Sequence, residues 1–337
     1  MDLDNVKSAI KPLDLSRLPS CTVQERAYFK HYGIDFEEKC DKIDHYFGSI
    51  NSDRFTIATH FFKNRKADKT CFILHGYYDH SGLFRHVVEY CLQRNYSVVI
   101  FDLPGHGLSS GTTASIDSFL HYQTVLADIS GFFFDATPKP WHAIAQSTGG
   151  AILSEFVLSN RRRIFQKIVM LAPLIYPKKW RVSKLTHLLS KNFIKKIPRN
   201  FADNSGDRDF LNFLKHRDPL QSRYLPMQWV AALDDWIGRF MSLVAAGCER
   251  ADLTKDNSGC EASCEPLIIQ GQCDGTVDWK KNVPIYEEKF PGLETYFIAR
   301  GKHQLANETP EILGEIYGVM DRYFSIERSP SLQRVSR

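Results

Sequence analysis

Long apolar runs and a secretory leader are both missing from this sequence. The apolar stretches, such as residues 168–173, are far shorter than the roughly 20 residues that a membrane-spanning helix requires. The first residues also lack the charged-then-apolar pattern with a small-residue cleavage site that marks a signal peptide. We therefore expect no transmembrane helix, no export by that route, and a cytoplasmic protein, with peripheral contact at the inner membrane surface left open.

Metal-ligand spacing is also missing. The eight cysteines are scattered, and a chain of 337 residues can fold without disulfides, so free thiols in a reducing compartment are expected. Cys260 and Cys264, with Cys248 and Cys273 nearby, could form part of a zinc site, but no histidine pair at ligand spacing accompanies them. The sequence therefore predicts no metal and no cofactor.

An excess of charge of one sign is missing as well. The net charge is only +4, and there is neither a basic array interleaved with aromatic residues nor a helix-turn-helix pattern, so we expect no nucleic-acid partner. What the chain does have is an ordinary globular composition, with 43% hydrophobic and 24% charged residues. One large domain, or one domain with an insertion, fits this length.

Strand and helix patterns alternate along most of the chain. Residues 42–50 and 54–62 are typical of two strands around a turn, and short apolar runs then alternate with amphipathic stretches. We expect further strands at 70–74, 97–101, 141–146, 167–173, 266–271 and 294–299. We expect helices at 83–94, 115–134 with Ser115 as the N-cap, 148–160, 279–290 and 310–324. This alternation predicts an α/β fold, in which a mostly parallel sheet is covered by helices on both faces.

Residues 143–150 read AIAQSTGG and lie between a predicted strand and a predicted helix. A serine in the pattern small-x-Ser-x-Gly is typical of a nucleophile elbow, in which a sharp strand-to-helix turn exposes the hydroxyl above the sheet. Ala145 and Gly149 are small, as a close crossing of strand and helix requires, although glycine is usual at the first of these positions. The alternative is that Ser147 only caps the helix, and this stretch alone leaves both interpretations open.

Other loops supply groups that would activate Ser147. The stretch LHGYYDHSG follows a strand, where such a fold supplies an oxyanion-hole N–H group; Tyr77 would give one and Thr148 the other. Asp274 follows a later strand, and His303 follows the next one. A serine hydroxyl needs an imidazole to accept its proton, and the imidazole needs a carboxylate to fix its tautomer. The order serine, aspartate, histidine is that of an α/β-hydrolase triad.

The sequence resembles the lysophospholipase and monoacylglycerol lipase branch of the α/β-hydrolases, and especially bacterial lysophospholipase-like members. The stretches that carry this resemblance, over about residues 55–324, are LHGYYDHSGLFRH, VVIFDLPGHGLSSG, AIAQSTGGAIL, HRDPLQ, IIQGQCDGTVDW and GKHQLANE. Gln146 and Thr148 depart from the pattern, which commonly has histidine and methionine there. The resemblance implies an α/β-hydrolase fold and a serine hydrolase acting on esters of monoacyl lipids. Its G-x-x-D-x-x-V motif falls on residues 271–277, which favours Asp274 over Asp278 as the acid.

Other titratable residues beside these motifs have structural interpretations. We expect His75 to orient the oxyanion loop and His106 to brace a loop near the site. Asp102 begins a loop rich in turn residues, and we interpret it as a structural turn residue. His303 therefore remains the candidate base.

Residues 177–264 interrupt the alternation of strands and helices at the place where this fold accepts a lid. We divide the chain into an N-terminal arm with the first strand (1–54), a hydrolase core (55–176 and 265–324), an inserted helical region expected to act as a lid (177–264) and a disordered tail (325–337). Met227, Trp229 and Trp236 are candidates for an acyl-chain pocket, or simply for packing within the inserted region.

The first part of the inserted region is strongly basic. Residues 178–199 hold eight lysines and arginines and no acid. Apolar residues recur there at roughly helical spacing, namely Trp180, Leu185, Leu188, Leu189, Phe193 and Ile197. Such a segment can lie on an anionic membrane surface, or it can be a lid helix with a solvated cationic face, and the sequence leaves both open.

From these residues we predict a serine hydrolase that cleaves carboxylic esters through an acyl-enzyme, with a lysophospholipid or a monoacylglycerol as the expected substrate. Two alternatives stay open: an esterase or amidase for small soluble acyl compounds, and a non-catalytic ligand-binding protein of the same fold. Dehalogenase and epoxide hydrolase chemistry are not expected, because both use a carboxylate where this chain has Ser147.

Overall fold

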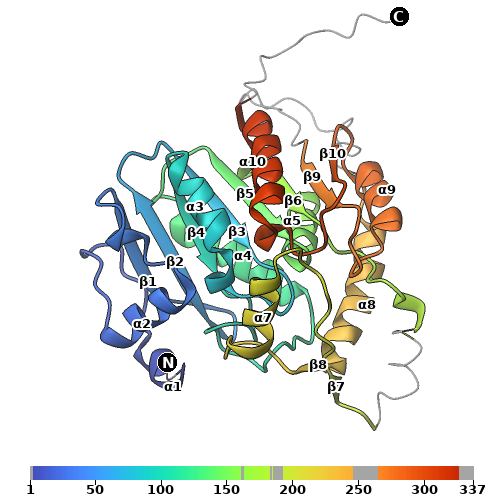
Figure 1. The fold of residues 1–337 in the computed structure, drawn as a ribbon, viewed down its shortest axis with the longest axis horizontal. Coiled ribbons are helices and arrows are strands. Elements are labelled where there is room, and N and C mark those ends of the chain that lie inside the picture. The colour runs from blue at the N-terminus through green and yellow to red at the C-terminus, as the bar shows by residue number, and fades with distance from the viewer. Residues whose placement is uncertain (1–2, 161–162, 183, 185–192, 246–264, 326–337) are drawn as a thin grey trace, which may run out of the picture.

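An eight-stranded sheet in the order β1-β2-β4-β3-β5-β6-β9-β10 forms the centre of the computed structural model, which describes residues 3–160, 163–182, 184, 193–245 and 265–325 (Figure 1). Its strands span Ile43–Ser52 (β1), Phe55–Asn64 (β2), Lys69–Leu74 (β3), Tyr96–Phe101 (β4), Trp141–Gln146 (β5), Phe165–Leu171 (β6), Leu267–Gly271 (β9) and Glu294–Ile298 (β10). β1 and β2 form an antiparallel hairpin and β2 is antiparallel to β4, whereas all the other neighbours are parallel. The predicted mostly parallel sheet is confirmed.

Helices cover both faces of this sheet. The α-helices span Leu3–Ala9 (α1), Val23–Tyr32 (α2), Arg85–Gln93 (α3), Leu120–Phe133 (α4), Thr148–Ser159 (α5), Arg208–His216 (α7), Met227–Ser242 (α8), Trp279–Lys289 (α9) and Pro310–Ser325 (α10). In Figure 1, α3 and α10 lie in front of the sheet, and α4 and α5 lie behind it. The buried side chains follow this division, because those of α2, α3 and α10 form one hydrophobic cluster and those of α4, α5, α8 and α9 form another.

The helix predicted at 115–134 begins later than expected, at Leu120, and Ser115 is not its N-cap. The segment before this helix forms a hydrogen-bonded loop instead. Ala114 adopts a φ of 53°, and its N–H group donates to the Gly105 carbonyl over 2.7 Å. The Ser115 hydroxyl is then used elsewhere, as a donor to Gln228 of α8 at 2.9 Å.

The described part of the inserted region contains a two-stranded antiparallel sheet, the helices α7 and α8, and helical residues at 180–182 and 184. Lys196–Pro198 (β7) pairs antiparallel with Tyr224–Pro226 (β8); α7 lies between these strands in the chain, and α8 follows them. The helical stripe predicted to reach Ile197 is therefore wrong at this end, because Ile197 lies in a strand. The three leucines of that stripe, Leu185, Leu188 and Leu189, lie outside the described residues.

The structure describes the N-terminal helices of the chain, but it describes almost none of the C-terminal tail. Near the N-terminus, Tyr28 and Phe29 of α2 are buried in the cluster that also contains α3 and α10. The predicted disordered tail lies outside the described residues, except for Ser325, which ends α10. Among the helices in the described ranges, none has both the length and the apolar character needed to cross a membrane.

Candidate active site

Ser147 occupies the sharp turn between β5 and α5. Its φ of 51° and ψ of −112° are unusual for a residue other than glycine, and such a conformation persists only where the surroundings hold it. Ser147 stands at the N-cap position of α5, but its side chain makes no capping hydrogen bond. A Cβ at Gly149 would lie 2.5 Å from the carbonyl oxygen of Leu74, so glycine is needed where the helix passes this strand. The geometry is that of a nucleophile elbow rather than of a simple helix cap.

Ser147, His303 and Asp274 form one chain of hydrogen bonds. The Ser147 Oγ lies 3.0 Å from Nε2 of His303, and Nδ1 of His303 lies 2.8 Å from Oδ2 of Asp274. All three side chains are buried. The rival carboxylate, Asp278, stands at the N-cap position of α9 instead. An imidazole that donates from Nδ1 to a carboxylate has Nε2 free to accept the serine proton.

The charges of this site favour an imidazolium at His303. Burial by itself would lower the pKa of His303, but the charge and hydrogen bond of Asp274 raise it above its ordinary value. Burial by itself would raise the pKa of Asp274, but His303 and the N–H groups of Thr276 and Val277 lower it below its ordinary value. The positive charge that forms when His303 accepts a proton is therefore stabilised in place.

Neighbouring strand ends bring the predicted oxyanion donors to Ser147. β3 and β5 are parallel and adjacent, and Gly76 and Ser147 each lie two residues past a paired position. A Cβ at Gly76 would lie only 3.3 Å from the Cβ of Ser147, so the backbone leading to Tyr77 runs against the predicted nucleophile. Thr148 is the first residue of α5, where a backbone N–H group has no partner within the helix.

Three buried residues next to the site hold the surrounding loops. His75 accepts the Leu103 N–H group at Nε2 over 2.9 Å, so its Nδ1 carries the proton and donates to the carbonyl of Gly76 at 2.7 Å. Burial lowers the pKa of both His75 and His106 to about 3, which keeps the two rings neutral. Asp102 accepts hydrogen bonds from two backbone N–H groups and a serine hydroxyl. Each of these residues makes the contacts of a structural residue.

Two glutamines near the triad were missed by the sequence analysis. Gln146 donates from Nε2 to the carbonyl of His303 over 2.7 Å and accepts the Ala306 N–H group at Oε1 over 3.1 Å, so it holds the loop that carries the base. Gln270 donates from Nε2 to Oδ2 of Asp274 over 3.1 Å. Both belong to fully buried strands, and a buried amide requires hydrogen-bond partners. The position of each glutamine in an otherwise apolar buried strand was the signal in the sequence that could have identified it.

The three residues predicted in the inserted region have different surroundings. Trp229 stacks on Tyr77, with ring centroids 3.7 Å apart, so it lies beside the predicted oxyanion donor. Trp236 is fully buried and donates from its ring nitrogen to Glu155 over 2.9 Å, which places it in the packing of α8 against α5. Met227 lines a hollow with a volume of about 830 Å³, whose other apolar and aromatic residues are Ile194, Tyr224 and Pro226.

The cysteines considered for a zinc site are only partly described. Cys248, Cys260 and Cys264 lie outside the described residues. Cys273 is exposed, and its Sγ lies 3.5 Å from the carbonyl of Ala299. Within the described ranges, no three or more histidine, cysteine, aspartate or glutamate side chains are arranged so that they could hold a metal ion.

Comparisons with known sequences identify the family to which this geometry corresponds. A model of the family described as serine aminopeptidase, S33, matches residues 65–310. A Mycoplasma pneumoniae protein provisionally named esterase/lipase 2 is 29% identical over 126 residues, which is 37% of this chain and 45% of that protein. The match therefore spans less than half the length of this curated relative.

Solved structures share the fold at low sequence identity. The monoacylglycerol lipase of Paleococcus ferrophilus superimposes with a TM-score of 0.62 at 16% identity, over 80% of this chain and 98% of that one. A soluble variant of the Saccharomyces cerevisiae monoglyceride lipase, solved with a substrate analogue, gives 0.63 at 16% identity, over 82% and 94%. Est1E of Butyrivibrio proteoclasticus, solved with ferulic acid, gives 0.55 at 18% identity, over 82% and 99%. The predicted α/β-hydrolase fold is confirmed.

Proposed function

Because the chain belongs to the serine aminopeptidase S33 family and is an α/β-hydrolase, we propose that it is a serine hydrolase of carboxylic esters, with a lysophospholipid or a monoacylglycerol as its substrate. The observation that carries the proposal is the hydrogen-bond chain from Ser147 through His303 to Asp274. A ligand-binding protein without catalytic activity would have no need for a strained serine aligned with a buried imidazole and carboxylate.

In this proposal, the reaction has two steps. Ser147 Oγ attacks the ester carbonyl carbon while its proton passes to Nε2 of His303, and the N–H groups of Tyr77 and Thr148 hold the oxyanion. The C–O bond to the alcohol then breaks, and the alcohol leaves with the proton from His303. Water attacks the acyl-enzyme with His303 again as base, which releases the fatty acid and restores the serine. Asp274 stays ionised throughout and holds the imidazole in the required tautomer.

Three observations support a monoacyl lipid as the substrate. The hollow beside Met227 is large enough for part of an acyl chain, and Ile194, Tyr224 and Pro226 line it together with polar and charged residues. Two of the solved structures with this fold are named as lipases of monoglycerides, and the curated relative is named as an esterase or lipase. The likeness of fold supports this substrate class and leaves the head group open.

We further propose that the end of the inserted region around the start of β7, residues 193–196, contacts an anionic lipid surface. Phe193 is 88% exposed, and Ile194, Lys195 and Lys196 are also exposed, so apolar and cationic side chains lie together there. The basic face is smaller than the sequence suggested. Lys184 pairs with Asp234 at 2.8 Å, and Arg199 donates to the buried Gln221.

A second candidate reaction is the hydrolysis of amides that adjoin a free amine, as the name of the serine aminopeptidase family implies. The same triad can cleave either bond, since ester and amide hydrolysis share the tetrahedral intermediate. The two candidates differ in what the site must recognise at the leaving group.

Labelling and a substrate panel decide between these proposals. We expect a fluorophosphonate probe to label the purified protein at Ser147, and acyl esters, monoacylglycerols and lysophospholipids of graded chain length to be cleaved fastest at long chain lengths. Aminoacyl anilides with a free amine serve as the amide arm. Faster cleavage of the anilides would replace the ester proposal with the peptidase one. Absence of labelling together with absence of turnover would refute both.

A further inference from the structure

The turn formed by residues 76–79, here called the oxyanion turn, is strained. Tyr78 adopts a φ of 69°, which is uncommon for a bulky residue. The N–H group of Asp79 closes the turn on the carbonyl of Gly76 at 3.1 Å. The N–H group of Tyr77 lies in the same planar peptide unit as this carbonyl, so the turn that holds the carbonyl also fixes the N–H group. A strained turn of this kind persists only if surrounding contacts hold it.

Residues of the inserted region hold Tyr78 by both its backbone and its ring. Gln221 donates from Nε2 to the carbonyl of Tyr78 over 3.0 Å and to Oδ2 of Asp218 over 2.8 Å. Arg199 donates to Oε1 of Gln221 over 2.7 Å, and its guanidinium lies 3.9 Å from the centre of the Tyr78 ring. The amide of Gln221 is thereby fixed at both its ends.

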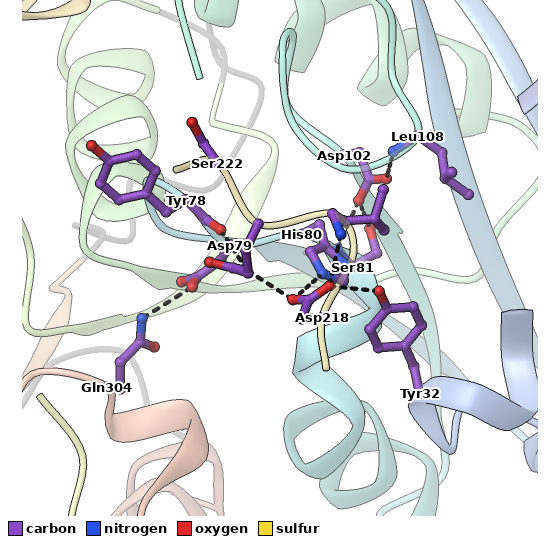
Figure 2. A network of polar contacts seen from close by, with 12 residues as sticks. Tyr32, Tyr78, Asp79, His80, Ser81, Asp102, Leu108, Asp218, Ser222 and Gln304 are labelled. Carbon is purple, nitrogen blue, oxygen red and sulfur yellow. Dashed lines mark hydrogen bonds and ion pairs between the residues drawn. The ribbon is translucent and has the colours of Figure 1, made fainter. Parts of the chain in front are cut away.

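Asp218 anchors these contacts in the core. Its buried carboxylate lies 3.1 Å from Nε2 of His80, directly after the oxyanion turn, and accepts the hydroxyl of Tyr32 over 2.7 Å. Figure 2 shows Asp218 between His80 and Tyr32, with Tyr78 and Asp79 beside them. The carboxylate therefore joins α2, the oxyanion turn and the inserted region. Asp218 also belongs to HRDPLQ, one of the stretches that carry the resemblance to the lipase branch.

We infer that Arg199, Asp218 and Gln221 form a clamp that holds the oxyanion turn in its strained conformation, so that these residues of the inserted region are positioning residues for ester hydrolysis. The inference rests on the proposed function, because the N–H group of Tyr77 acts as a donor only in that proposal. It assigns to the inserted region a share in turnover itself, beyond covering the substrate.

The clamp predicts a specific kinetic defect. Loss of a whole oxyanion donor costs about 10²- to 10³-fold in kcat, and displacement of a donor by a fraction of its bond length should cost less, about 10- to 100-fold. The loss should appear in kcat with KM within about twofold, because an oxyanion donor acts on the transition state rather than on the bound ester.

Two matched substitutions test the clamp. Gln221→Met keeps the length of the side chain and removes its hydrogen bonds to Tyr78 and Asp218. Gln123→Met is the control, because Gln123 also donates from Nε2 to one backbone carbonyl, at 3.0 Å, and to one carboxylate, at 2.9 Å, but does so between α4 and α5. Steady-state kinetics on a soluble short-chain ester, its pH profile and chemical unfolding would be measured for both variants. Amide hydrogen exchange of the peptide around residues 75–81 gives a readout that needs no activity.

The expected result is a loss in kcat for Gln221→Met alone, with faster exchange in the oxyanion turn and an unchanged acid limb of the pH profile, since the pairing of His303 with Asp274 is intact. Equal behaviour of the two variants, or a rise in KM with kcat preserved, would overturn the clamp. If Gln221→Met does not fold, Arg199→Lys, which retains the charge but loses the planar guanidinium, is measured in its place. If the wild type shows neither labelling nor turnover, the proposed function fails, and the exchange rates still decide whether the clamp exists.

Discussion

The oxyanion turn is held from two sides that are built in different ways. On the side of the sheet, His75 connects the carbonyl of Gly76 to Leu103, in the segment after β4, and Asp79 accepts a hydrogen bond from Gln304, in the segment after β10. On the other side, Gln221 reaches it from the inserted region. The first set of contacts is complete once the parallel sheet has formed, whereas the second requires the inserted region to dock. The catalytic residues and the clamp residues that position the oxyanion turn thus lie in different parts of the molecule, and each part can be perturbed separately.

Removal of the nucleophile should give the largest effect and should leave both sides of the turn intact. For Ser147→Ala we expect kcat on a short-chain ester to fall by about a million-fold, because the remaining members of a triad achieve little without it. The free energy of unfolding should hardly change, since the hydroxyl is a single partner of His303. Kinetics and chemical unfolding measure both quantities. Labelling of this variant by a fluorophosphonate at the wild-type rate would remove Ser147 from the mechanism.

Substitution of Asp274, the acid of the triad, tests the sheet side next. Asp274→Asn should lower kcat by about 10⁴-fold, because an amide facing Nδ1 stabilises the wrong tautomer of His303. Asp278→Asn is the matched control, and it should change kcat by less than about threefold, the size expected of a residue at a helix N-cap that touches no triad member. Equal losses in the two variants would leave the acid unassigned.

The sheet side of the site was largely predictable from the sequence, and the reason is local. β5 occupies residues 141–146 as expected, because a six-residue buried run ends at the small-x-Ser-x-Gly pattern. Parallel strands end at one edge of the sheet, so loops that follow successive strands must meet there. The order of serine, aspartate and histidine along the chain therefore predicted which residues would meet, and the structure brings those three together.

The inserted side was not predictable in this way. The bond between Tyr32 and Asp218 joins residues 186 positions apart, and no periodic pattern marks either of them. Ile197 lies in a strand in spite of the helical spacing of the apolar residues before it, because β7 pairs with a strand that lies beyond α7. Ser115 was misread for a similar reason, since its hydroxyl is bound by a residue of α8. Contacts of this kind depend on tertiary structure that a single sequence does not display.

Removal of the Asp218 charge should weaken the contacts between the inserted region and the core, and so lower the stability of the protein. The charge and hydrogen bond of His80 lower the pKa of Asp218 to about 2 against the effect of burial, and Asp218, Asp102 and Asp79 raise the pKa of His80. The carboxylate contributes stability above its unfolded pKa of about 3.9, and the imidazolium contributes below its unfolded pKa of about 6.5. The pair is therefore fully effective between about pH 4 and pH 6.5.

Asp218→Asn should lower the free energy of unfolding by about 3 kcal/mol within that window, as expected when one partner of a buried ion pair is removed. The difference should shrink as the pH rises through the folded-state pKa of His80, where the wild type loses the pair as well. Urea unfolding at several pH values measures this. A difference that stays constant up to pH 9 would show that the hydrogen bonds of Asp218, rather than its charge, hold the clamp.

The smallest effect should come from the exposed residues 193–196 of the inserted region, which take no part in the proposed reaction. Each basic side chain near an anionic surface contributes about 1 kcal/mol, so Lys195→Gln with Lys196→Gln should weaken binding to anionic vesicles by about 2 kcal/mol at low salt. Higher ionic strength should weaken the wild type in the same direction, because the attraction is screened. Turnover of a soluble short-chain ester should stay unchanged. The control is Lys63→Gln with Lys66→Gln, which removes two exposed charges at the β1–β2 end of the sheet. Cosedimentation that is absent in the wild type, or that falls equally in both double variants, would leave residues 193–196 as a solvated surface and would favour small soluble esters as substrates.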